Sequence, residues 1–512
     1  MDVEVLIAGA GPTGLVLAID LLRRGVSCRI VDRLPEPAAG SRGFTLKPHT
    51  LGLLDGLGVA DRIRAAGSSD GRSRIHIGPR KLCDLAVPPD PDPARNAVGL
   101  PEFRTERILR ERLAELGGRV EFGAGLVDFK DETGASGDDD GDQAVTATLA
   151  DGSTCTARFL VGADGGGSTV RGTLGVAFEG RTDEDTRALI MDVPIAGLDR
   201  AAGTHLWFLE RGMVAARPIP HDDHWQLSMG GGPASRGGDV QRALTEATGR
   251  TDIRVGTPRW QSIWRYNVRL AAAYRKGSVF LCGDAAHVHS PFGGHGMNTG
   301  IQDAINLGWK LELVLRGYAS RALLETYESE RRPVGEAILA DSDRQKSSLL
   351  PPRLLRPLMR FVLPRLLTRN AIRDRATYPK YTGSPLTATS GEVTPSSRVT
   401  PSGKVAPTGE VAPSGKLVPS GEVVPSGEIA PALPDAHDGR LFTALTFGPS
   451  VPELGPLTDF TQVIRSDDLA LAYAAAPGAV VLIRPDGYLA LTTNDPAAIE
   501  SYATVLCGPG RP

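Results

Sequence analysis

Residues 3–32, VEVLIAGAGPTGLVLAIDLLRRGVSCRIVD, contain the pattern that decides the fold. The apolar run at 3–8 predicts a buried strand, the glycine-rich residues 9–14 a tight turn, residues 15–24 a helix and residues 27–31 a second strand. A strand, turn, helix and strand in this order form the βαβ unit of a doubly wound parallel sheet. The amino terminus therefore predicts an α/β fold.

The turn at residues 9–14 has the spacing GxGxxG between a strand and a helix. Glycines in this context let the backbone approach a pyrophosphate, which the free N–H groups at the helix N-terminus can bind. The turn residues that we expect at such a ligand are Gly9, Gly11, Pro12, Thr13 and Gly14. The turn therefore predicts a bound dinucleotide and leaves NAD and FAD open.

Two residues at the end of the second strand bear on the same ligand. The carboxylate of Asp32 can accept hydrogen bonds from both hydroxyls of an adenosine ribose. Arg33 would suit a 2′-phosphate, but Asp32 would repel one. We therefore expect Arg33 to be solvated or stacked.

A second ligand-binding pattern lies at residues 278–311, SVFLCGDAAHVHSPFGGHGMNTGIQDAINLGWKL. An apolar strand runs into Gly283 and Asp284, and a glycine-broken loop then leads to a helix from about residue 299 to residue 315. The helix start presents free N–H groups to an electron-rich group. Asp284 can accept hydrogen bonds from the hydroxyls of a sugar or sugar alcohol.

The composition of the chain excludes several classes of protein. With 512 residues it is long enough for two or three domains, and its net charge of −3 offers no basic surplus for nucleic acid or anionic membranes. Five scattered cysteines without CxxC spacing argue against disulfides and zinc and for a reducing cytoplasm. No apolar run approaches the length of a membrane-spanning helix, and the amino terminus lacks the features of a signal peptide.

Three further regions define the organisation of the chain. Residues 185–230 alternate between apolar and polar and predict antiparallel strands, whose large side chains either pack in a core or form a floor under a flat ligand. The candidates for such a floor are Trp207, Phe208, Met213, Trp225 and Met229, with Phe292 from the glycine loop. Residues 393–428 repeat a proline-containing hexapeptide and predict a linker. Residues 439–512 predict a small α/β module with a hairpin in AVVLIRPDGYLAL.

A third motif, residues 159–171 (FLVGADGGGSTVR), is a strand that ends in Asp164 and Gly165 and leads into a helix. GxGxxG, this DG segment and the GD segment at 283–284 together resemble the class A flavoprotein aromatic hydroxylases, the p-hydroxybenzoate hydroxylase superfamily. Within it, the chain resembles the monooxygenases that modify aromatic polyketides and antibiotics. The resemblance covers nearly the whole chain.

The resemblance implies an α/β fold with a Rossmann-like FAD-binding domain of the GR2 type, an inserted antiparallel β-sheet substrate domain and a C-terminal thioredoxin-like domain. The FAD-binding domain would comprise residues 1–175 and 273–385, with residues 72–100 pairing with the substrate domain. The substrate domain would comprise residues 176–272. A linker at 386–434 would lead to the C-terminal domain at 435–512, which lacks CxxC and is expected to be structural or dimer-forming.

The resemblance also implies roles for single residues. The glycines of the first turn would hold the pyrophosphate of FAD, Asp32 its ribose and Asp284 its ribityl chain. Arg42 would contact the flavin phosphate or ring region, and Asp164 would serve both FAD and NAD(P)H. Arg104 and His295 stand where relatives often carry glutamine. The ring environment would comprise Pro291, Gly293, Gly294, Gly296, Met297 and Asn298, with Gly283 next to the ribityl site.

The implied reaction is the NAD(P)H- and O₂-dependent hydroxylation of a polycyclic aromatic, polyketide-like substrate through a flavin C4a-hydroperoxide. The cofactor supplies the hard chemistry, so no obligate protein nucleophile is expected. His205, His221 and His224 are candidates for a phenol-activating base. A Baeyer–Villiger or epoxidising monooxygenase and a flavin-binding protein without catalysis remain alternatives. No metal site is expected, since His287 and His289 lie on a loop without a third ligand motif.

Overall fold

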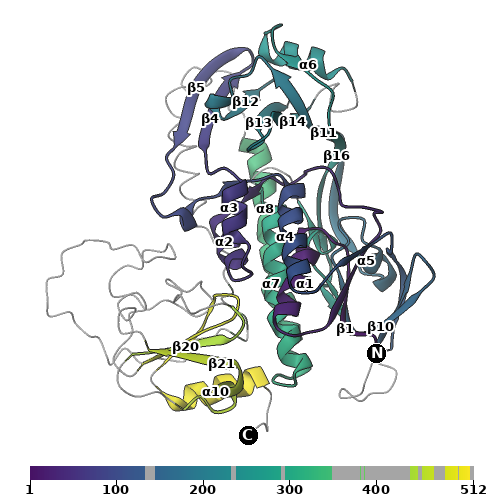
Figure 1. Cartoon of the computed structure of the whole chain (residues 1–512), viewed down its shortest axis with the longest axis vertical. Helices are drawn as coiled ribbons and strands as arrows, with labels where there is room; N and C mark the ends of the chain where they lie inside the picture. The colour runs from purple at the N-terminus through teal and green to yellow at the C-terminus, as the bar shows by residue number, and fades with distance from the viewer. Residues whose placement is uncertain are drawn as a thin grey trace, which may run out of the picture.

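The computed structural model describes residues 1–132, 144–210, 212–231, 238–289, 294–348, 381, 384, 386, 439–447, 453–465, 479–493 and 495–507. Within these residues three large sheets are packed with helices (Figure 1). The hexapeptide repeat, most of the acidic loop at 131–142, and the loop residues Pro291, Phe292 and Gly293 lie outside the described residues.

The first sheet is mostly parallel and contains the amino-terminal βαβ unit. Its strand order is β17-β18-β10-β1-β2-β7, and β9 and β8 extend it beside β10. The strands are β1 (Val3–Ala8), β2 (Cys28–Asp32), β7 (Val120–Phe122), β8 (Leu126–Asp131), β9 (Val145–Leu149), β10 (Thr154–Gly162), β17 (Arg275–Lys276) and β18 (Val279–Leu281). The parallel pairing of β1 with β2 and β10 confirms the βαβ unit. The three predicted motifs follow β1, β10 and β18, which are neighbours in this sheet.

Helices cover this sheet and form its core with it. They are α1 (Pro12–Arg23), α2 (Pro48–Asp55), α3 (Ala60–Ala66), α4 (Glu102–Glu115), α5 (Thr169–Leu174), α7 (Gly296–Leu315) and α8 (Glu325–Ser348). A small ladder of β3 (Thr45–Leu46) and β6 (Val98–Gly99) lies outside the large sheets. The predicted helices are all present, with ends shifted by a few residues.

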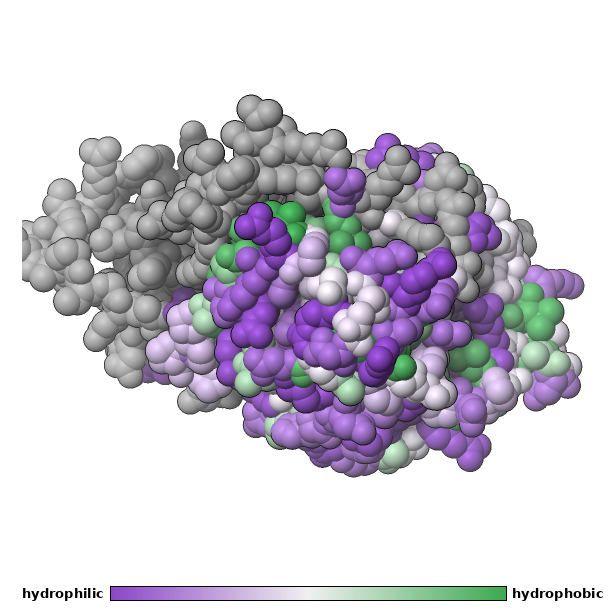
Figure 2. Space-filling view, turned by 90° about the horizontal axis from the view of Figure 1, so that it is seen from above, coloured by the Kyte–Doolittle hydropathy of each residue, from purple (hydrophilic) through white to green (hydrophobic). Residues whose placement is uncertain are grey.

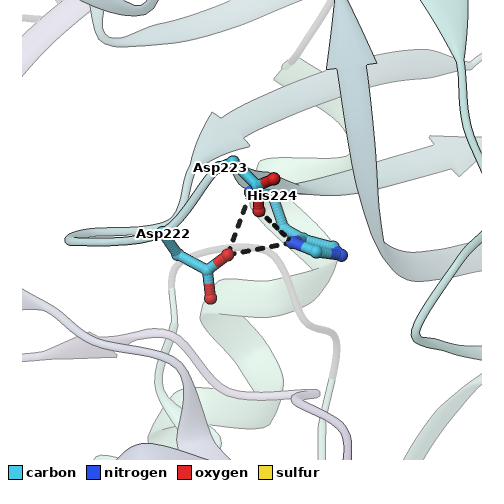
Figure 3. Close-up of side chains that lie close together, drawn as sticks. All are labelled: Asp222, Asp223 and His224. Carbon is cyan, nitrogen blue, oxygen red and sulfur yellow. Dashed lines mark hydrogen bonds and ion pairs between the residues drawn. The ribbon is translucent and has the colours of Figure 1, made fainter.

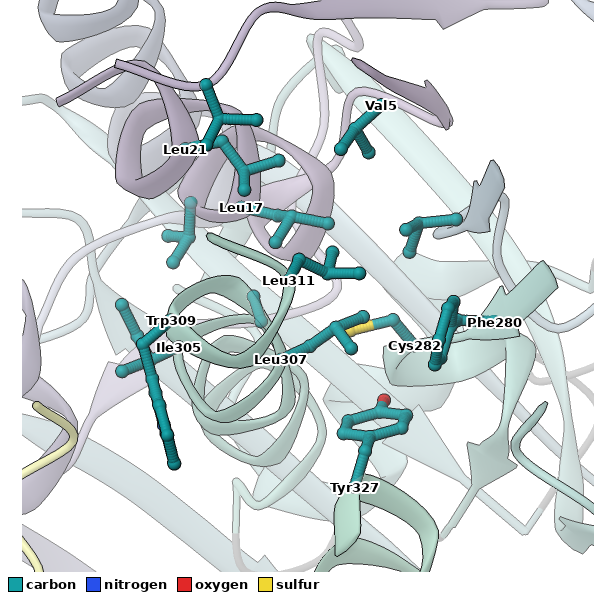
Figure 4. Close-up of a cluster of buried hydrophobic side chains, with 14 of the residues drawn as sticks. Val5, Leu17, Leu21, Phe280, Cys282, Ile305, Leu307, Trp309, Leu311 and Tyr327 are labelled. Carbon is teal, nitrogen blue, oxygen red and sulfur yellow. The ribbon is translucent and has the colours of Figure 1, made fainter. Parts of the chain in front are cut away.

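The central contact of the core is between α1 and α7. Leu17 and Leu21 of α1 and Leu307 and Leu311 of α7 are almost fully buried in one cluster (Figure 4). Burial of each such side chain contributes roughly 1.5–3 kcal/mol. A Cβ on Gly300 would lie 2.3 Å from Thr13 Oγ1, so glycine there lets the start of α7 approach the first glycine turn.

The second sheet has nine strands and is largely antiparallel. Its order is β19-β16-β11-β14-β13-β12-β4-β5, with β15 beside β11, and only β12 and β4 pair in parallel. The strands are β4 (Gly71–Ile77), β5 (Arg80–Val87), β11 (Phe178–Ala196), β12 (Thr204–Phe208), β13 (Met213–Pro218), β14 (His224–Gly230), β15 (Arg254–Val255), β16 (Trp260–Ala271) and β19 (His287–Val288). Helix α6 (Val240–Thr248) packs on one face.

The third sheet, of four strands, is formed by the carboxyl-terminal residues. Its order is β21-β20-β22-β23, with β20 (Phe442–Thr446), β21 (Thr461–Arg465), β22 (Val480–Ile483), β23 (Leu489–Thr493) and helix α10 (Pro496–Cys507). β22 and β23 form the predicted hairpin. Arg484 in its turn pairs with Glu330 of α8 at 2.6 Å, and both side chains are fully buried. A buried ion pair therefore joins this sheet to helix α8.

The face of the molecule that is seen from above is mainly polar (Figure 2). Charged and polar residues cover most of the face in Figure 2, and hydrophobic residues lie there in small groups. None of the described helices is both long and apolar enough to cross a membrane.

Candidate functional site

A cavity of about 1910 Å³ lies between the first and second sheets. The strand ends and turns of the first sheet form one wall, and the face of the second sheet that points away from α6 forms the other. All three predicted motifs reach it, because the carboxyl ends of neighbouring parallel strands meet at one edge of a sheet. The tertiary structure therefore brings the three motifs to one site.

The first glycine turn is packed too tightly for side chains at two of its three glycines. Gly9 has a φ of +106°, and a Cβ there would lie 2.3 Å from the carbonyl oxygen of Ala163. A Cβ on Gly14 would lie 2.0 Å from the carbonyl oxygen of Gly9. A Cβ on Gly11 would meet nothing within 4 Å, although Gly11 lines the cavity. Only Gly11 therefore leaves open space in front of the backbone.

Asp32 holds the turn and faces the cavity at the same time. Its Oδ2 accepts a hydrogen bond from the backbone N–H of Ala10 (2.7 Å), and its Oδ1 accepts one from Leu34 (2.8 Å). Each oxygen keeps a lone pair for a further donor. Arg33 also lines the cavity.

Asp284 lies on a 3₁₀ turn (Gly283–Ala285) directly after β18 and opens on the cavity. Desolvation by the surrounding protein raises the pKa of the Asp284 carboxyl above the usual value. The charge of Glu102 adds to this shift, and His287 and Arg42 oppose it. A Cβ on Gly283, whose φ is +62°, would lie 2.6 Å from Thr13 Oγ1. The GD and GxGxxG segments are therefore in contact.

Asp164 has a structural task besides facing the cavity. Its Oδ2 accepts hydrogen bonds from the N–H groups of Thr169 (2.7 Å) and Val170 (3.2 Å) at the start of α5. Its Oδ1 is buried and has no hydrogen-bond partner among the described residues. The hydrogen bonds of Asp164 therefore hold the start of α5 beside the DG turn.

The start of α7 forms a polar end of the cavity. Gly294, His295, Gly296 and Met297 line it, together with Lys47. Lys47 Nζ lies 3.2 Å from His295 Nδ1. Because an ammonium group only donates, Nδ1 accepts this hydrogen bond and the ring proton is on Nε2. A cation, a ring N–H and the free N–H groups of a helix start therefore lie together.

Asn298, expected at the same place, points elsewhere. Its side chain is buried, its Oδ1 accepts from the N–H of Lys47 (2.8 Å), and its Nδ2 donates to the carbonyl oxygens of Thr45 and Gly294 (both 2.8 Å). It therefore holds β3 against the start of α7 and does not line the cavity.

Helix α4 contributes acidic residues that the sequence analysis did not single out. Glu102, Glu106 and Arg110, spaced four apart, lie on one face of the helix and line the cavity. Burial, with repulsion from Glu102, raises the pKa of Glu106 to about 8, against the opposing charge of Arg110. The Oε2 of Glu102 accepts from the N–H groups of Arg42 and Gly43 and so holds the segment that places Arg42 on the cavity wall. The spacing of four residues between these charged side chains is the sequence pattern that could have indicated a common face of α4.

Arg104, two residues beyond Glu102, lies on another face of α4 and does not line the cavity. Its Nη2 pairs with Asp222 Oδ2 at 2.7 Å, and Arg259 Nη1 reaches the same oxygen at 3.1 Å. Asp222, Asp223 and His224 lie close together (Figure 3), an arrangement that could hold a cation. The two arginines already pair with Asp222, and hydrogen bonds from His224 and Arg259 hold the pKa of its carboxyl well below the usual value despite burial. Ion pairing within the protein accounts for this cluster.

Five of the six candidates for a ligand floor divide between the two faces of the second sheet. Phe208 and Met213 line the cavity. Trp207, Trp225 and Met229 are buried on the other face in the cluster with α6, so core packing explains them. Phe292 lies outside the described residues. The candidate bases are not among the described residues that line the cavity; they are His205, His221 and His224.

Comparison with known proteins agrees with this geometry. Residues 2–342 match the family described as "FAD binding domain". A flavin-dependent monooxygenase of Mycobacteroides abscessus is 35% identical over 97% of this chain and 98% of its own length. A 6-methylpretetramide 4-monooxygenase of Streptomyces rimosus is 40% identical over 66% of this chain and 61% of its own length.

Two solved structures extend the similarity to the whole fold. The anhydrotetracycline hydroxylase from Streptomyces rimosus superposes with a TM-score of 0.72 at 28% identity and full coverage of both chains. An aklavinone-11 hydroxylase in complex with FAD and aklavinone superposes with a TM-score of 0.75 at 25% identity, covering 98% of this chain and 99% of that chain.

Proposed function

This chain belongs to the FAD-binding-domain family and to its flavin-dependent monooxygenases, and from that premise we propose that it uses NAD(P)H and O₂ to hydroxylate a polycyclic aromatic substrate of the polyketide type. The observation that carries the proposal is the cavity in which the three motifs meet a partly apolar face of the second sheet. The similarity to monooxygenases of tetracycline precursors and to an aklavinone hydroxylase supports the substrate class.

The residues of the first wall fit FAD. Glycine at 9 and 14 is required by close backbone packing, and Gly11 leaves room in front of the helix start, as a pyrophosphate needs. We assign the pyrophosphate to residues 9–14, the ribose to Asp32 and the ribityl chain to Asp284. The ring environment would be Gly294, Gly296 and Met297, with Arg42 nearby and Pro291 and Gly293 in the same loop.

The residues at the start of α7 would act on the charge of the ring. FAD, when bound, accepts electrons from the reductant and uses O₂ to deliver one oxygen atom to the substrate. The free N–H groups of α7, Lys47 and the Nε2–H of His295 provide fixed positive potential where the electron-rich edge of the ring would lie. A substrate held between this point and the second sheet would displace water from it.

The apolar face of the second sheet is the proposed substrate floor. Phe208 and Met213 belong to it, and the chain segment 176–272 would serve as the inserted substrate domain. We further propose a thioredoxin-like fold for residues 435–512, a linker at 386–434 and a homodimer, as the resemblance implies. Asp164, which lines the cavity, would contribute to both FAD and NAD(P)H binding.

Purified protein with bound FAD tests the proposal directly. NAD(P)H oxidation would be followed with polycyclic phenols in isotopically labelled O₂, and the product would be analysed by mass and position. We expect ligand-stimulated oxidation and one labelled oxygen on an aromatic carbon. A ring-expanded ester or an epoxide would indicate the alternative oxygen insertions. FAD without any stimulated oxidation would indicate a non-catalytic flavin protein.

A further inference from the structure

Arg217, near the end of β13, is a cation on the cavity wall. Its Nη1 donates a long hydrogen bond to Thr45 Oγ1 (3.4 Å), and its guanidinium lies over the ring of Phe44 at 4.6 Å from the centroid. Among the described residues no carboxylate forms an ion pair with it. Burial alone lowers the pKa of Arg217, to about 10, so it remains charged at neutral pH.

Another arginine of the cavity wall, Arg72, is neutralised: it pairs with Asp70 at 2.7 Å. A partly desolvated cation without a partner is unfavourable unless a ligand supplies the opposite charge. The cavity beside Arg217 is therefore suited to an anionic group.

A row of three apolar side chains and one serine lies next to Arg217 on the same sheet face. Ile190, Ser228, Ala215 and Leu206 are consecutive cross-strand partners on β11, β14, β13 and β12, and all four line the cavity. Three strand spacings give this row a width of about 14 Å. Arg217 follows Ala215 by two residues, so its Cα is about 7 Å further along the same face. The small side chains at 215 and 228 leave the middle of the row less filled than its two ends.

Arg217 also lies where this row meets the start of α7. Thr45, its hydrogen-bond partner, is the residue closest to a Cβ built on Gly294, at 3.7 Å. Gly294 belongs to the loop proposed to contact the flavin ring. A ligand group at Arg217 would therefore be held beside the loop that is proposed to contact the flavin ring.

We propose that Arg217 binds an ionised oxygen, a phenolate, enolate or carboxylate, of a flat fused-ring substrate whose rings lie on the row of Ile190, Ser228, Ala215 and Leu206. The proposal rests on the proposed function, because it specifies the substrate of the same cavity. A nearby cation favours the ionised form of a phenol. An ionised phenol is more electron-rich at its ring carbons, which favours their oxygenation.

Matched ligands test this in the full-length protein with bound FAD. Anthraquinone-2-carboxylate and its neutral carboxamide would be titrated against the flavin absorbance spectrum. We expect the wild type to bind the carboxylate about tenfold to a hundredfold more tightly, as a charge-assisted hydrogen bond contributes. Arg217→Gln should remove this preference, Arg217→Lys should retain part of it, and Arg72→Gln should leave it unchanged.

Several results would overturn the proposal. One is equal or absent binding of the two probes by the wild type, and another is an undiminished preference in Arg217→Gln. A loss of FAD in Arg217→Gln with the preference retained would assign Arg217 to the flavin. FAD content and NAD(P)H oxidation of the wild type are measured separately, so failure of the proposed function is recognised independently.

Discussion

Asp303 Oδ1 lies 2.6 Å from Arg331 Nε, and both side chains are fully buried between α7 and α8. The other oxygen of Asp303 accepts hydrogen bonds from the N–H of Gly283 (3.1 Å) and from His287 Nε2 (2.6 Å). One carboxylate thus joins α8 to the turn that carries Asp284. Burial opposes its ionisation, but the charges of Arg331 and His287 hold its pKa below the usual value.

Replacement of Asp303 by asparagine should therefore destabilise the protein. The change leaves Arg331 charged and buried, which typically lowers the free energy of unfolding by about 3–5 kcal/mol. Urea denaturation of the FAD-free protein would measure it. Arg332→Gln is the control, because its pair with Glu336 is partly exposed and should contribute less than about 1 kcal/mol. A loss below about 1 kcal/mol in Asp303→Asn would contradict the prediction.

Alanine at Gly11 and at Gly14 should have different effects. In Gly14→Ala the new Cβ meets the carbonyl oxygen of Gly9 at 2.0 Å, so the free energy of unfolding should fall by more than about 2 kcal/mol even without FAD. Gly11 has a φ of −71° and open space, so Gly11→Ala should keep the stability of the FAD-free protein.

The same Gly11→Ala protein should bind FAD at least about tenfold more weakly, because the methyl group occupies the space proposed for the pyrophosphate. Thermal unfolding and fluorescence titration with FAD separate the two effects. Unchanged FAD affinity in Gly11→Ala would show that the pyrophosphate lies elsewhere.

Asp284→Ala should yield largely FAD-free protein after purification. The substitution removes the carboxylate proposed to accept hydrogen bonds from the ribityl hydroxyls, and each charge-assisted bond contributes about 1.5–3 kcal/mol to binding. The ratio of flavin to protein absorbance measures the result. Asp61→Ala, at a highly exposed carboxylate on α3, is the control and should retain FAD. Full flavin content in Asp284→Ala would refute the ribityl assignment.

Glu106 should make the stability of the FAD-free protein depend on pH. Its folded pKa, about 8, lies above its unfolded value, so its contribution is complete below about pH 4.5 and is lost as the pH rises towards 8. Glu106→Gln removes this dependence. The variant should therefore gain about 2–4 kcal/mol relative to the wild type between pH 5 and 8.5.

Urea denaturation at several pH values would measure this gain. Glu111→Gln, at an exposed position of the same helix, should follow the wild type at every pH. Parallel curves for Glu106→Gln and the wild type would show that Glu106 is ionised in the folded protein at neutral pH.

The sequence alone determined the first sheet and the segments that form the cavity wall. GxGxxG, the DG segment and the GD segment depend on local chemistry: glycine where backbone atoms crowd, an acid at a strand end, an apolar run before it. Such patterns are visible without knowledge of distant residues. They located Gly9, Asp32, Asp164 and Asp284 at the cavity.

Only the tertiary structure decided which side of an element faces the cavity. One face of the second sheet packs on α6, and the other lines the cavity. The alternation of residues along β12 therefore could not show that Trp207 packs on α6 while Phe208 lines the cavity. On α4 the helical period separates Glu102 from Arg104, but which of them faces inward depends on the packing of the helix. That no carboxylate of the described residues pairs with Arg217 emerges only when strands distant in sequence are assembled, because the charges around a side chain are a property of its surroundings.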